Sequence, residues 1–89
     1  MSAAPSAAEI AAAILAGVAR RRPGGTLCPS EVARSLAGRD GDWRSMMPAV
    51  RAAAAGLLAE GRIAVTQRGR AVPADKAGPI RLGRPTTGT

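Results

Sequence analysis

The sequence has few of the residues that usually carry chemistry: among 89 residues there is no His, Tyr or Phe, one Cys and one Trp. Without His or a second Cys, we expect no nucleophile activated by a neighbouring base and no metal site. The single Cys28 excludes an internal disulfide, so nothing indicates an oxidising compartment. The sequence therefore predicts a binding module without cofactor or metal, and not an enzyme.

Aromatic residues and long apolar runs are also missing. Without Phe and Tyr, the chain lacks the platform on which single-stranded nucleic acids stack. No apolar run approaches the roughly 20 residues that cross a bilayer. The Ala-rich N-terminal run is interrupted by Glu9 and has no Lys or Arg before it, so we do not expect a signal peptide. A cytoplasmic protein without a membrane partner is the expectation.

Positive charge is what the chain has in excess. Its net charge is +7, with 13 basic and 6 acidic residues, and such a balance favours a polyanionic partner such as nucleic acid. All but one of the basic residues are Arg, and Ala, Gly and Pro are also abundant. A GC-rich genome produces the same bias without selection for binding, so composition leaves both explanations open.

Helix signals are clear in the first half of the chain. The segment Ser6-Ala7-Ala8-Glu9 matches a capping box, and apolar residues follow it at four-residue spacing, which predicts a helix that ends near Arg21. A second helix is predicted over residues 29–36. Its Pro29 suits the first helical position, which places Cys28 at the N-cap.

A turn rich in Gly, Asp and Arg at residues 38–42 precedes a third helix, expected from Trp43 to about Glu60 with Asp42 as its N-cap. Pro48 inside this helix predicts a kink or a partly separate first turn. At 100° per residue the helix has an apolar side and an opposite, exposed side of small residues. The small residues are Ser45, Ala49, Ala52, Gly56 and Ala59.

Alternating apolar residues after Gly61 predict a strand over residues 62–67 and a return strand around Ile80 and Leu82. Helix, turn, helix and β-ribbon is the order of a winged helix-turn-helix. We therefore predict a mainly α fold with a small β-hairpin in residues 6–82, between tails at residues 1–5 and 83–89. The expected core is Ile14, Val18, Val32, Leu36, Val50, Leu57, Ile63 and Ile80.

Five segments together resemble a small bacterial family of uncharacterised proteins: residues 27–34, 42–44, 47–51, 60–63 and 78–82. That family is a domain of unknown function that is thought to fold as a winged helix. The resemblance covers nearly everything from Ile10 to Leu82. It implies the fold, and it implies no activity because the family has none to carry over.

The candidate binding residues lie in three places. Arg44 and Arg51 share one edge of the third helix about 10 Å apart, so one could reach base edges and the other a phosphate. Ser45 belongs to the small-residue side, which lets a DNA backbone approach. Phosphate contacts are further predicted for Arg68, Arg70 and Lys76 in the hairpin and for Arg20 and Arg21. A solvated helix flank, a solubilising hairpin tip and a favourable helix-dipole interaction explain the same residues without DNA.

Double-stranded DNA is the partner that these residues predict, in a transcriptional regulator or an accessory domain. Because Arg51 lies off the apolar side, its replacement by Ala is expected to weaken binding without unfolding the domain. The alternative is a protein–protein interaction module that uses the exposed Ala/Gly side of the third helix. The oligomeric state stays open.

Overall fold

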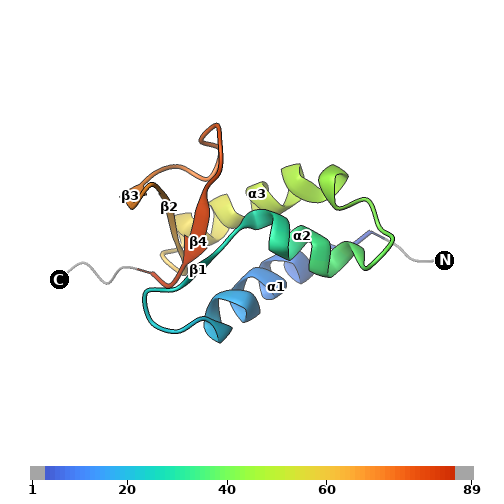
Figure 1. Cartoon of the computed structure of the whole chain (residues 1–89), viewed down its shortest axis with the longest axis horizontal. Coiled ribbons are helices and arrows are strands. Elements are labelled where there is room, and N and C mark those ends of the chain that lie inside the picture. Colours follow the sequence, from blue (N-terminus) through green and yellow to red (C-terminus); the bar gives the residue numbers. More distant parts are fainter. Residues whose placement is uncertain (1–3, 86–89) are drawn as a thin grey trace.

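The computed structural model describes residues 4–85. Within them three helices pack on a four-stranded antiparallel sheet (Figure 1). The order along the chain is that of a winged helix-turn-helix, as the sequence predicts. The elements are α1 (Ala7–Arg20), β1 (Thr26–Leu27), α2 (Pro29–Ala37), α3 (Trp43–Ala59), β2 (Ala64–Gln67), β3 (Arg70–Ala71) and β4 (Arg81–Gly83).

The first helix is capped at both ends by side chains. The Ser6 hydroxyl accepts from the Glu9 amide at 3.1 Å, and the Glu9 carboxylate accepts from the Ser6 amide at 2.9 Å. Hydrogen bonding of the Glu9 carboxylate with the Ser6 backbone, and secondly with the Ser6 side chain, holds the pKa of Glu9 below its ordinary value. At the other end, the Arg84 guanidinium donates to the carbonyls of Ala19 and Arg21 at 3.2 and 2.8 Å. The capping box confirms the sequence prediction.

The predicted C-terminal boundary of the domain is too early. Gly83 is buried in β4, where it pairs with Thr26 on one side and Ala64 on the other. Arg84 then caps α1. The domain extends past Leu82 because Gly83 and Arg84 both contact elements that are distant in the sequence. The remainder of the predicted tails, residues 1–3 and 86–89, lies outside the described residues.

The sheet has the order β1-β4-β2-β3. Val65 pairs with Leu82, as expected for the return strand. The sequence did not predict β3, which pairs with β2 through a tight turn at Arg68 and Gly69. Both turn residues have positive φ, 54° and 80°, which is the signature of a type I′ hairpin turn. Residues 68–80, between β2 and β4, are called the wing below.

The core forms where the three helices meet the inner face of the sheet. Seven of the eight predicted core residues are buried, and Leu36 is half-buried against them. Ile14, Val50 and Ile80 come from three different elements or their flanks and have no exposed surface. The apolar periodicities therefore predicted which side of each element faces inward.

The third helix runs without interruption from Trp43 to Ala59, so Pro48 does not separate its first turn. Asp42 caps it by accepting from the Ser45 amide at 3.3 Å. The small-residue side is exposed, as predicted. The preceding turn needs glycine at position 41, because a Cβ there would lie 2.1 Å from the carbonyl oxygen of Ala37. This close approach fixes the connection between α2 and α3.

Candidate nucleic-acid interface

Arg44 is held against an aromatic ring at the start of α3. Its guanidinium carbon lies 4.6 Å from the centroid of the Trp43 ring, and that of Arg34 lies 4.4 Å from the same centroid. Both distances are within the range of cation–π attraction. Trp43 itself is half-buried and packs against the core. The ring orients two guanidinium groups at the surface, and such orientation lowers the entropy lost on binding a ligand.

Arg34 and Arg39 were missed in the sequence. Both are exposed; Arg34 lies in α2 and Arg39 in the turn between α2 and α3. Arg34 comes from the last turn of α2, so its position beside Trp43 depends on how the two helices cross. The spacing of Arg34 within α2 could have suggested an exposed residue near the turn, but not its aromatic partner.

Ser45 takes part in the N-terminal cap of α3. Its hydroxyl donates to the Asp42 carbonyl at 2.9 Å while its amide donates to the Asp42 carboxylate. The side chain remains exposed and lies in the first turn of α3, next to Arg44. Its position is the predicted one, and the hydrogen bonds make it part of the helix cap.

The wing presents its three cations to solvent. Arg68, Arg70 and Lys76 are exposed. Within residues 4–85 the two ion pairs join Arg21 to Glu31 and Arg62 to Glu60, so neither pair includes a wing cation. These three charges are therefore available to an anion.

Arg51 does not share a free surface with Arg44. Its guanidinium donates to the carbonyls of Ala74, Lys76 and Gly78 at 3.3, 2.9 and 3.0 Å. The side chain thus joins α3 to the wing, and it is half-buried. Arg51 lies off the apolar side of α3, as predicted, but the wing covers that edge, so the side chain is not a free surface residue.

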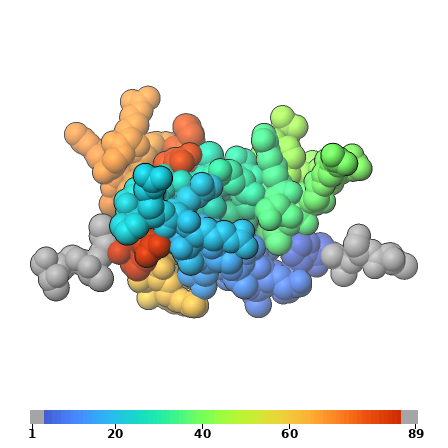
Figure 2. All heavy atoms as spheres, turned by 60° about the horizontal axis from the view of Figure 1, so that its bottom comes forward, coloured from blue at the N-terminus to red at the C-terminus, as the bar shows by residue number. Residues whose placement is uncertain are grey.

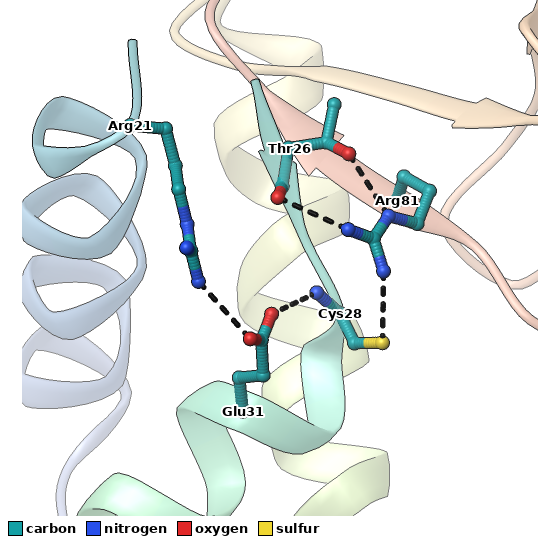
Figure 3. A network of polar contacts seen from close by, with 5 residues as sticks. All are labelled: Arg21, Thr26, Cys28, Glu31 and Arg81. Atoms are coloured by element: carbon teal, nitrogen blue, oxygen red, sulfur yellow. Dashed lines mark hydrogen bonds and ion pairs between the residues drawn. The ribbon is translucent and has the colours of Figure 1, made fainter.

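Arg21 also has partners within the chain. It pairs with Glu31 at 3.0 Å, and Glu31 in turn accepts from the Cys28 amide at 2.6 Å (Figure 3). Cys28 occupies the N-cap of α2, as predicted. The network ties the C-terminal end of α1 to the start of α2. Arg20, next to it, is exposed.

The same close-up shows Arg81, a functional candidate that no sequence pattern indicates (Figure 3). Its guanidinium donates to the hydroxyl and the carbonyl of Thr26 at 2.9 and 3.1 Å and to the Cys28 sulfur at 3.2 Å. These contacts join β4 to β1 and to the start of α2. Only its place between the inward-facing Ile80 and Leu82 could have marked Arg81 as an outward residue.

Two segments of the chain project from the same side of the molecule. Figure 2 shows the wing, in orange, and the connection of α2 to α3, in green, rising from the same side at opposite ends. The wing carries three exposed cations, and the connection with the start of α3 carries Arg39 and Arg44. The fold therefore brings two of the predicted basic regions, the start of α3 and the wing, to one side. Arg51 and Arg21 instead make contacts within the chain.

A shallow groove runs between α1 and α3. Small apolar residues line most of it, among them Ala8, Ala12, Ala52 and Gly56. A Cβ added at Gly56 would meet nothing within 4 Å. Part of the exposed Ala/Gly side of α3, at Ala52 and Gly56, is therefore one wall of a groove that is open to solvent.

The described residues contain no helix long and apolar enough to cross a membrane. They also contain no group of three or more His, Cys, Asp or Glu side chains placed to hold a metal ion.

Fold and surface together define a winged helix-turn-helix domain with a two-part basic side. The chain belongs to a family described as protein of unknown function (DUF3253), whose model matches residues 7–85. This match confirms the resemblance to an uncharacterised family and covers all seven helices and strands. No curated protein matches the chain.

Proposed function

We propose that this domain binds double-stranded DNA in the cytoplasm, as a transcriptional regulator or an accessory domain, and that it is not an enzyme. The observation that carries the proposal is that two segments with exposed basic residues, the connection leading into α3 and the wing, project from one side (Figure 2). In winged-helix and related proteins the N-terminal residues of the recognition helix meet base edges. Arg44 takes that position here.

The wing supplies the contacts that position the domain. Arg68, Arg70 and Lys76 reach phosphates beside the groove, and Arg20 contributes to the flanking backbone. Contacts of this kind give affinity without reading sequence. Few side chains on the exposed part of α3 can read bases: Arg44 is the one Arg there, and Asn and Gln are absent from the helix. The proposal is therefore a domain with weak sequence preference.

The direct test is a fluorescence-anisotropy titration of the full chain on a random duplex over a series of salt concentrations. With Arg51 engaged by the wing, about four phosphate contacts remain, and we expect a log–log salt slope of about −3 to −4. Absence of binding at low salt, where basic domains associate even without specificity, would sink the proposal.

Arg68 offers a variant that removes charge without cost to the fold. Its φ of 54° is a left-handed conformation, which costs an ordinary L-residue about 1–2 kcal/mol. Asn-Gly is the preferred type I′ pair, so Arg68→Asn should keep or raise the free energy of unfolding by up to about 1 kcal/mol. Duplex affinity should nevertheless fall, and the salt slope should flatten by about one unit.

The matched control for this variant is Arg62→Gln, which removes the same charge from an exposed residue that already pairs with Glu60. Urea denaturation and the same anisotropy titration measure both variants. Equal loss of affinity in the two would mean that only net charge matters, and it would remove the wing from the proposed interface.

A second candidate function is docking of a partner helix in the groove between α1 and α3. The observation that favours it is the wall of small residues, which lets a backbone approach closely. Binding of this kind depends little on salt, because no counterions are released. Partner binding that survives high salt would support this alternative over DNA.

A further inference from the structure

A hollow of about 520 Å³ lies at the base of the wing, where β2 ends and β4 begins. Its polar lining comes from Gln67 at the end of β2, Arg68 in the turn, Lys76 in the wing and Arg81 in β4. No carboxylate lines it. Three basic residues from separate parts of the chain thus line one concave space, and their positive charge favours an anionic occupant.

The loop that forms one wall of the hollow is held from both sides. Arg51 donates to the carbonyls of residues 74, 76 and 78. From the other side, the Gln67 side-chain amide donates to the carbonyls of Ala77 and Pro79 at 2.9 and 3.1 Å. Five loop carbonyls therefore already accept hydrogen bonds from side chains. They compete little for the cations of the hollow, and the wall is fixed before a ligand arrives.

Arg81 is fixed as well. Its three hydrogen bonds to Thr26 and Cys28 hold the guanidinium in place (Figure 3). The charge of Arg81 therefore contributes without further loss of side-chain entropy, while Arg68 and Lys76 are exposed and free to close on an anion. Gly78 keeps the wall close, because a Cβ there would lie 3.1 Å from the Gln67 amide nitrogen.

We infer that the hollow at the base of the wing binds one phosphate group, with Arg68 and Lys76 as its direct donors and Arg81 as a fixed neighbouring charge. One source of that phosphate is the backbone of duplex DNA, and for this source the inference rests on the proposed function. A free phosphate compound carries the same chemistry. Arg70 is outside the site, although it is only two residues from Arg68, because it does not line the hollow.

The first arm of the test uses inorganic pyrophosphate as the probe, followed by backbone amide chemical shifts of the full chain. Shifts should concentrate at Gln67, Arg68 and residues 76–78 and should saturate. Lys76→Gln should weaken pyrophosphate binding by about tenfold, the loss of one hydrogen bond between charged groups. Arg62→Gln, which removes an equal charge from an exposed residue that does not line the hollow, should leave it nearly unchanged. Shifts spread over all the arginines, or equal weakening by both variants, would overturn the inference.

The second arm uses the random duplex. Lys76→Gln should flatten the salt slope by about one unit, and Arg62→Gln should not. If the duplex binds but the two variants behave alike, the phosphate site is wrong and the DNA proposal stands. If the duplex fails to bind while pyrophosphate still saturates the hollow, the DNA proposal is wrong and the site serves a free phosphate compound.

Discussion

Replacement of Leu57 by Ala is expected to lower the free energy of unfolding by about 2–5 kcal/mol. Leu57 is 3% exposed and lies on the side of α3 that meets α1 and the sheet. The truncation leaves a cavity that the neighbouring side chains cannot fill, in addition to the lost burial. A small domain has only about 5–15 kcal/mol of stability in total, so this single change removes a large share.

Urea denaturation followed by helical circular dichroism measures the loss. Leu58→Ala is the matched control, because Leu58 is the same residue type one position along α3 and is only half-buried. The control should lose clearly less stability. Similar losses at both positions would contradict the orientation of α3 described above.

The helices and the core could be predicted because their signals are local. Ser6 and Glu9 form a capping box within one turn, and Val50 and Leu57 recur on one side of a helix, so neighbouring residues determine the outcome. The pairing of Val65 with Leu82 followed from alternation in two strands that each need one buried side. In all these cases a short segment contains the information.

The sheet edge and the side-chain contacts of the wing could not be predicted in the same way. β3 exists because Arg68 adopts a left-handed conformation that arginine seldom takes, so the Arg68-Gly69 pair gave only a weak turn signal. Arg84 caps a helix that ends more than 60 residues earlier. Such contacts depend on how distant elements pack, and no periodicity encodes them.

In the candidate site too, features set by a single element could be predicted, and contacts between distant elements could not. The exposed wing cations and Arg44 lie where the sequence placed them, since each is on an outward side of its own element. Arg51 is also off the apolar side, yet the wing covers it. A sequence pattern distinguishes core from surface for one helix, but it does not reveal which surface another part of the chain will cover.

Arg51 therefore gives the second large effect. Arg51→Ala is expected to lower the free energy of unfolding by about 2–3 kcal/mol, because it removes the charged donor of three carbonyls, one of which, that of Ala74, is in a part-buried hydrogen bond. The damage should concentrate in the wing. Hydrogen exchange of the Lys76 amide, which donates to the Pro73 carbonyl, should accelerate, while the Val72 amide, bonded to Val65 in the hairpin, should keep more of its protection.

Arg51→Lys separates this structural role from a role as a DNA-binding charge. Lysine keeps the positive charge but has a compact ammonium on a flexible stem, and it lacks the planar fork that reaches carbonyls in a fixed geometry. If Arg51 holds the wing, Lys should restore little of the stability or of the Lys76 protection. If Arg51 instead binds phosphate, Lys should restore the salt slope on duplex DNA, and Ala should barely change the free energy of unfolding. Three hydrogen bonds from one guanidinium to the carbonyls of residues 74, 76 and 78 favour the first outcome.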